Sequence, residues 1–214
     1  MKIQIIGCGG VGGNLAYLLT KETRVDHFVL CDHDVVEHKN LSRQFFFHKQ
    51  IGMNKAEALK ENLLAINPEL TVDAFPIKIE EDLDLEFFEK EALTILATDN
   101  VTSKQRCGKY FHHFALTNCE RGIVEIKTFL DKEERTAWDM GGGYMSTQTF
   151  GSNMAAAVNL REMILTDALF GMAFKMTLKY PFYNGDVKYA EDYDKESALN
   201  IPTVTTAIPS SGGM

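Results

Sequence analysis

Short apolar runs alternate with longer segments of helical spacing through the first half of the chain. The predicted strands are residues 2–6, 27–31, 70–76 and 93–97, and the predicted helices are residues 10–20, 53–66, 84–91 and 101–114. This alternation predicts an α/β fold with a Rossmann-like, doubly wound, mostly parallel sheet covered by helices on both faces. The helix over 53–66 is the best marked, because Asn54 can cap its start and Asn67-Pro68 ends it.

The pattern changes in the second half. Residues 114–117 and 123–129 are strand-like and flank a turn around Arg121-Gly122, which predicts an antiparallel extension of the sheet. Residues 131–149 are charged and glycine-rich, as in a loop, and a helix rich in small residues is expected over 152–169. We therefore divide the chain into two parts of one domain. Residues 1–130 form a Rossmann-like ATP-binding part, and residues 131–214 form a loop, a packing or dimerisation helix and C-terminal strands.

Composition and charge narrow the class of protein. The chain has 214 residues and a net charge of -8, which argues against a general affinity for nucleic acid. Neither a leader segment nor an apolar run of membrane-spanning length is expected from the sequence. The four cysteines form no C-x-x-C pair, so no structural zinc is expected, and a reducing, cytoplasmic setting fits best.

The segment between the first strand and the first helix predicts a phosphate site. It reads Gly7-Cys8-Gly9-Gly10-Val11-Gly12, and glycines allow a ligand to approach the backbone next to the free N–H groups of a helix start. Asp32 ends the second predicted strand, where a carboxylate can accept hydrogen bonds from a ribose. Together these features predict a bound nucleotide.

Residues further along the chain favour ATP over a dinucleotide. Arg43 offers a planar fork for phosphate oxygens, and Lys55, at a helix start, adds a second cation. Asp99 follows a predicted strand and can hold Mg²⁺. An NAD(P)-linked oxidoreductase is an alternative, but it leaves Arg43, Gln44, Lys55 and Asp99 without a role.

These residues resemble the motifs of the ThiF/MoeB-type adenylyltransferases, whose fold is shared with ubiquitin-activating enzymes. The matching positions, over residues 1 to about 130, are Gly7, Gly9, Gly10, Gly12, Asp32, Asn40-Leu41-Ser42-Arg43-Gln44, Lys55 and Thr98-Asp99-Asn100. The resemblance implies that Asp32 binds the ribose, that Asn40, Arg43, Gln44 and Lys55 bind the triphosphate, and that Asp99 binds magnesium. The catalytic residues would then be Arg43, Lys55 and Asp99, and the chain a minimal member of the family without its zinc motifs.

The resemblance also implies a reaction and partners. A carboxylate, usually the C-terminal glycine of a ubiquitin-like or sulfur-carrier protein, would attack the α-phosphorus of ATP and give an acyl adenylate and pyrophosphate. Relatives work as pairs of homologous subunits, so a homodimer with the helix 152–169 near the contact is expected. A heterodimer, or a nucleotide-binding regulatory subunit, is the alternative, because the sequence lacks the N-terminal helix that many relatives carry.

Two residues carry open interpretations. Cys119 is a candidate nucleophile for a thioester with the activated carboxylate, although a cysteine is more often a small buried hydrophobe. Asp34 either assists the nucleotide and magnesium, positions the loop that carries Arg43, or caps a turn.

Overall fold

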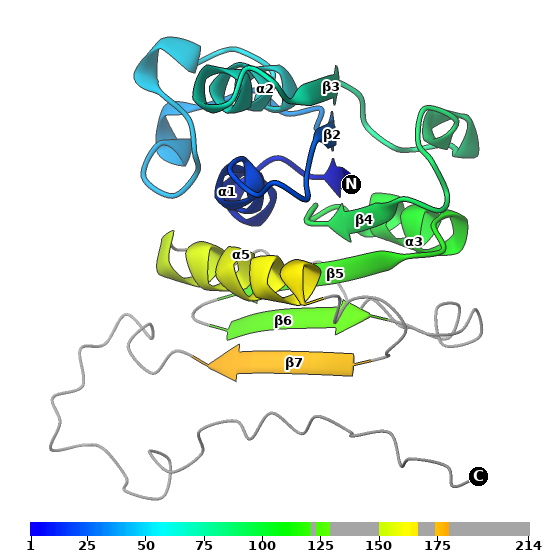
Figure 1. The fold of residues 1–214 in the computed structure, drawn as a ribbon. Helices are drawn as coiled ribbons and strands as arrows, with labels where there is room; N and C mark the ends of the chain where they lie inside the picture. Colours follow the sequence, from blue (N-terminus) through cyan, green and yellow to red (C-terminus); the bar gives the residue numbers. More distant parts are fainter. Residues whose placement is uncertain (121–122, 129–149, 167–173, 180–214) are drawn as a thin grey trace, which may run out of the picture.

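The computed structural model describes residues 1–120, 123–128, 150–166 and 174–179. In these ranges the chain forms a seven-stranded sheet of strand order β3-β2-β1-β4-β5-β6-β7 (Figure 1). The strands are β1 (Lys2–Ile6), β2 (His27–Cys31), β3 (Thr71–Phe75), β4 (Leu93–Leu96), β5 (Phe114–Glu120), β6 (Ile123–Thr128) and β7 (Phe174–Lys179). The α-helices are α1 (Gly10–Leu19), α2 (Lys55–Ile66), α3 (Val101–Tyr110) and α5 (Phe150–Leu165), and the 3-10 helices are η1 (His38–Asn40), η2 (His48–Gln50) and η3 (Asp82–Leu85).

The strand directions confirm the predicted doubly wound sheet. Strands β1 to β5 pair in parallel, whereas β6 pairs antiparallel with both β5 and β7. The chain winds outward from β1 in both directions, because β1 lies between β2 and β4. In such sheets ligands bind in the crevice where the order reverses, at the carboxyl ends of the strands. A ligand site is therefore expected at the carboxyl ends of β1, β2 and β4.

Helices cover both faces of the sheet (Figure 1). On one face, α1, α2 and α5 bury a large apolar cluster that includes Leu15, Leu59 and Leu160. On the other face, α3 and the η3 segment bury a smaller cluster that includes Cys107 and Phe111. Cover on both sides explains why every residue of β4, and every residue of β1 except Lys2, is buried, the polar Gln4 and Thr94 included.

Helix α5 joins the second half of the chain to the first. It packs against α1 and also contacts β5 and β6. Arg161 pairs with Glu22, with Nε 3.0 Å from the carboxylate, and Arg24 donates to the carbonyl of Leu165 at 2.6 Å. Much of the apolar surface that led us to expect a subunit contact is thus used inside the chain, while Phe150 and Val158 stay exposed.

Two predicted helices need correction. The helix expected over 84–91 is wrong, since only η3 forms there. The side chain of Asp84 accepts from the backbone of Glu80 and of Glu81, each at 2.9 Å, and such local bonds compete with a helical ladder. The helix expected over 101–114 is too long, because the backbone turns extended at the buried Phe111 and His113 already accepts from the backbone of Thr94 in the sheet.

Several expectations fall outside the described residues. These are the turn at Arg121-Gly122, the loop 131–149, the end of the helix expected to 169 and the segment after 179. Among the described helices, none combines the length and the apolar character needed to cross a membrane.

Candidate functional site

The glycine-rich turn between β1 and α1 lies against the end of β4. Gly7 has a φ of +99°, and a β-carbon there would lie 2.6 Å from the backbone of Ala97 and Thr98. A side chain at Gly12 would meet the carbonyl oxygen of Gly7. Both positions therefore require glycine, which keeps α1 tight against the strand ends and leaves the carboxyl edge of the sheet open to a ligand.

The start of α1 differs from the starts of α2 and α3. Asn54 caps α2 by accepting from Ala56 and Glu57, and Asn100 caps α3 by accepting from Ser103. The N-cap of α1 is Gly9, which has no side chain to do so, and the first turn carries no acidic residue. The positive end of α1 thus has no side-chain cap among the described residues that would compete with an anion.

Asp32 follows β2 and is held beside the glycine turn. Its Oδ2 accepts from the backbone of Cys8 at 2.7 Å, and its Oδ1 accepts from the backbone of Asp34 at 2.9 Å. Burial raises the pKa of Asp32, and the charge of Lys55 offsets only part of that rise. Each carboxylate oxygen has a further lone pair, so a ribose hydroxyl can still donate to it.

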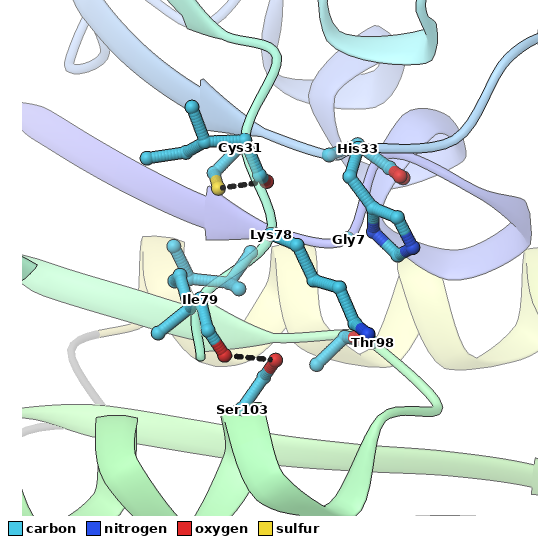
Figure 2. Close-up of a pocket in the computed structure, with 10 residues that line it drawn as sticks. Gly7, Cys31, His33, Lys78, Ile79, Thr98 and Ser103 are labelled. Carbon is cyan, nitrogen blue, oxygen red and sulfur yellow. Dashed lines mark hydrogen bonds between the residues drawn. The ribbon is translucent and has the colours of Figure 1, made fainter. Parts of the chain in front are cut away.

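Asp32 is one of the residues that line a pocket, which Figure 2 shows with Gly7, Cys31 and His33 labelled. Its lining comes from the ends of β1, β2 and β4, the segment after β3 and the start of α3, namely Ile6, Gly7, Cys31, Asp32, His33, Ile77, Lys78, Ile79, Thr98 and Ser103. Ser103 donates to the carbonyl of Ile79 at 2.9 Å, and the Cys31 thiol donates to that of Ile77 at 3.4 Å. These bonds fix the segment after β3 as one wall. Sequence reasoning missed this wall, because no motif marks residues 77–79.

Lys55, the first residue of α2, pairs with Asp34. Its Nζ lies 2.7 Å from Oδ2 of Asp34, and the side chain of Lys55 is only 9% exposed. Burial disfavours ionisation of Asp34, but the hydrogen bond and charge of Lys55 outweigh it and hold the pKa of Asp34 below its usual range. The charge of Lys55 also acts on Asp32, where it lowers the pKa against the effect of burial.

The other predicted phosphate ligands lie on the segment between β2 and α2. Asn40 is buried, and its Oδ1 accepts from the backbone of Glu37 at 2.8 Å, so its visible role is to shape that segment. The amide of Gln44 lies over Gly9, where a β-carbon would be 3.4 Å from Nε2. Arg43 follows the same loop, and its Nη1 donates to the carbonyl of Lys39 at 3.4 Å.

Three buried polar atoms, on the loop before α2 and on α5, lack partners among the described residues. They are Nε of Arg43, Oε1 of Gln44 and Oδ1 of Asn153, each without a hydrogen bond to any described residue. Asn153 lies on α5, and its Nδ2 donates to the carbonyl of Arg43 at 3.3 Å. Sequence reasoning missed Asn153, whose only signal was a polar residue in a helix of small apolar ones. Buried polar groups are normally paired, so this cluster is suited to a polar ligand.

Two places offer carboxylates to a metal ion. Asp99, the predicted magnesium ligand, is exposed directly beyond β4, next to the pocket residue Thr98. Asp32, His33 and Asp34 also bring one ligand atom each within 4.8 Å of one another. Carboxylate oxygens at the edge that would receive phosphates suit Mg²⁺.

Burial affects how readily the cysteine thiols ionise. Burial raises the pKa of the Cys8 thiol well above its usual value, and it raises that of Cys107 to about 12. Neither thiol is therefore a ready nucleophile. Cys119 lies on β5 opposite Val124 of β6, and its candidacy as a thioester nucleophile stays a prediction.

The sequence profile of the ThiF family matches residues 1–131. Ubiquitin-like modifier-activating enzyme 5 of Arabidopsis thaliana is 33% identical over 106 residues, covering 50% of this chain and 22% of that enzyme. SUMO-activating enzyme subunit 2 of Dictyostelium discoideum is 32% identical over 112 residues, covering 50% of this chain and 16% of that protein. The alignments thus span less than a quarter of these relatives' lengths.

Solved structures share the fold. The crystal structure of E. coli MccB with ATP has a TM-score of 0.67 at 18% identity, over 87% of this chain and 61% of MccB. The crystal structure of PaaA has a TM-score of 0.67 at 19% identity, over 85% of this chain and 61% of PaaA. At such identities the likeness concerns the fold alone. The relatives named here give no support to the oxidoreductase alternative.

Proposed function

We propose, from the premise that this chain belongs to the ThiF family, that it binds ATP and adenylates the C-terminal carboxylate of a small protein or peptide. One observation carries the proposal. The uncapped start of α1 lies against Gln44 and Asn153, each of which has a buried polar atom unpaired among the described residues, and Gly7 of the same turn lines the pocket with Asp32. An anionic chain attached to a nucleoside matches that arrangement.

In this proposal the nucleoside and the phosphates occupy the two ends of the site. The ribose bonds to Asp32, and the base lies in the pocket against the wall formed by residues 77–79. The phosphates lie at the glycine turn and the start of α1. Their remaining contacts come from Asn40, Arg43, Gln44 and Lys55, of which Asn40 acts through the loop that it shapes.

The chemistry needs little beyond alignment and charge. An oxygen of the acceptor carboxylate attacks the α-phosphorus, and the bond from that phosphorus to the bridging oxygen of pyrophosphate breaks. Pyrophosphate leaves with the electron pair, so the products are an acyl adenylate and pyrophosphate. A carboxylate is already ionised at neutral pH, so no general base is required, and Arg43 and Lys55 neutralise charge on the leaving phosphates.

Magnesium is the cofactor we propose, with Asp99 as its protein ligand. The exposed carboxylate at the end of β4 would hold a hard cation, which prefers oxygen ligands. When bound, Mg²⁺ would screen the charge of the triphosphate.

The acceptor class and the subunit arrangement are also proposals. Relatives named for activating ubiquitin-like modifiers and SUMO support a small protein with a C-terminal glycine as the acceptor. A homodimer is proposed with the exposed Phe150 and Val158 of α5 near the contact. Light scattering at micromolar concentration would measure the mass, and a monomer with full activity would overturn the homodimer.

The test begins with nucleotide binding. Calorimetry should give a much tighter dissociation constant for ATP with Mg²⁺ than for NAD⁺, because the cations are arranged for a triphosphate. ATP–pyrophosphate exchange is then run with and without small proteins and peptides that end in glycine, and exchange should require one of them. Tighter binding of NAD⁺ would overturn the proposal. If the protein binds ATP but catalyses no exchange even when a second subunit is added, the regulatory alternative would be favoured.

A further inference from the structure

We propose that Asn153 of α5 is a positioning residue of the nucleotide site, which holds the Arg43 segment at the correct distance from the start of α1. The inference rests on the proposed function and extends it to a residue outside the matched family region of 1–131. Asn153 is fully buried, with 0% of its surface exposed. It lies 110 positions from Arg43 in the sequence, yet the two residues are joined by a hydrogen bond.

The carboxamide of Asn153 occupies the space that a side chain at Gly10 would need. A β-carbon at Gly10 would collide with Nδ2 and Cγ of Asn153. The glycine at the first residue of α1 is therefore matched to a polar group from α5. On its other side the same carboxamide donates from Nδ2 to the carbonyl of Arg43 at 3.3 Å. Asn153 thus bridges the helix start and the loop whose residues were expected to bind the phosphates.

The oxygen of the same carboxamide stays without a partner in the described part of the chain. Oδ1 of Asn153 has no hydrogen-bond partner among the described residues, as is also true of Nε of the adjacent Arg43. Leaving a buried acceptor and a buried donor unpaired costs free energy in the protein without ligand. A role confined to packing would be met by an apolar side chain of similar volume without that cost. The polar group is explained if a ligand, or water that accompanies it, completes the network.

The helix that carries Asn153 is anchored independently of the site. Arg161 bonds to Glu22, and Arg24 bonds to the carbonyl of Leu165. Ala156 and Ala157 are buried in the contact with the sheet and α1. Because these contacts fix α5, a change at Asn153 alters the bridge to Arg43 without releasing the helix.

The experiment compares Asn153→Asp and Asn153→Ala with the matched variant Asn159→Asp. Asn159 lies on the same helix, and its Nδ2 bonds only within it, to the carbonyl of Ala155 at 2.8 Å. Asn153→Asp keeps the volume of the side chain but places a negative charge beside the phosphates, whereas Asn153→Ala removes the bridge without adding charge. Circular dichroism and thermal unfolding report whether each variant is folded.

The informative measurement is the affinity for ATP set against the affinity for adenosine, which lacks the phosphates. Both Asn153 variants should bind ATP more weakly, by about tenfold for Asn153→Ala, which loses one hydrogen bond, and by more for Asn153→Asp, which adds a charge of the same sign as the phosphates. Their adenosine affinity, and both affinities of Asn159→Asp, should stay within about twofold of the original protein, since packing changes alone move both ligands together.

Equal losses for ATP and adenosine in either Asn153 variant would show that the residue only maintains the fold, and the inference would be overturned. Unchanged ATP affinity in both variants would overturn it as well. Failure of the unsubstituted protein to bind ATP is a separate result, seen before any variant is made, and it would overturn the proposed function together with this extension of it.

Discussion

The nucleoside end and the phosphate end of the candidate site are built in opposite ways. At the nucleoside end, both oxygens of Asp32 accept backbone N–H groups, and Ser103 and Cys31 each donate to the facing wall. At the phosphate end, the start of α1 has no side-chain cap, and Arg43, Gln44 and Asn153 each keep an unpaired buried atom among the described residues. The first end is completed by the fold, whereas the second is left for a ligand to complete.

The difference follows from where each end originates in the chain. The groups that hold Asp32 come from turns directly after β1 and β2, which pair in register from Lys2 and His27 onward. Their geometry is therefore fixed by the sheet. The phosphate end combines the loop before α2 with α5, whose contact joins residues 110 positions apart in the sequence. We infer that variants at the phosphate end change ligand affinity more than stability.

The largest expected effect comes from removing a cation at the phosphate end. Arg43→Ala and Lys55→Ala should each lower ATP–pyrophosphate exchange by about a hundredfold, because each donor stabilises developing phosphate charge by about 3 kcal/mol. Adenosine affinity should be unchanged for Arg43→Ala. The measurements are exchange with an acceptor that supports it and calorimetry with the nucleoside.

Arg106→Ala is the matched control. Arg106 also has a buried Nε without a partner among the described residues, but it lies on α3 and pairs with Asp82 at 2.6 Å. Its removal should leave exchange within about twofold, since a surface ion pair contributes about 1 kcal/mol or less. If Arg43→Ala behaves like Arg106→Ala, the unpaired Nε of Arg43 does not mark a phosphate site, and the comparison between the two ends fails.

A smaller effect, of a different kind, is expected at the nucleoside end. Asp32→Asn keeps the shape of the side chain but turns an NH₂ group toward one of the two backbone N–H donors, from Cys8 or Asp34. The affinities for ATP and for adenosine should therefore fall together, by about tenfold, and the protein should lose about 1–3 kcal/mol of stability. Calorimetry with both ligands and thermal unfolding test this. A loss confined to ATP would place Asp32 at the phosphate end.

The sequence predicted the consecutive elements around the glycine turn better than the contacts between distant segments, for a physical reason. Periodicity and glycine spacing report local structure, and β1, the glycine turn, α1 and β2 are consecutive. The motif residues Arg43 and Lys55 were identified, but the contact of Lys55 with Asp34 was not, because no sequence rule gives its pairing. The role of Asn153 was not predicted, because one asparagine in a helix produces no periodic pattern in the sequence. The failed helix over 84–91 has the same origin, as Asp84 bonds locally instead.

The smallest expected effect concerns the pair at the boundary of the two ends, Asp34 with Lys55. The neighbouring carboxylates shift in opposite directions, because burial raises the pKa of Asp32, while Lys55 overcomes the effect of burial at Asp34 and lowers its pKa from 3.8. A lowered pKa in the folded state means that Asp34 stabilises the protein at pH values above its unfolded pKa. That contribution is lost as the pH falls through the folded pKa, below 3.8.

Asp34→Asn should therefore lower stability at neutral pH, and the difference from the original protein should shrink as the pH is brought below about 4. The pair is partly open to solvent, so the difference at neutral pH should stay below about 1 kcal/mol. Denaturant unfolding across this pH range, in a double-mutant cycle with Lys55→Met, isolates the interaction of the two side chains. A coupling that grows as the pH falls would contradict the assigned direction. A coupling free energy well above 1 kcal/mol would mean that Asp34 fixes the side chain of Lys55 in the protein without ligand. Lys55 would then resemble Asp32, whose hydrogen bonds the fold itself completes.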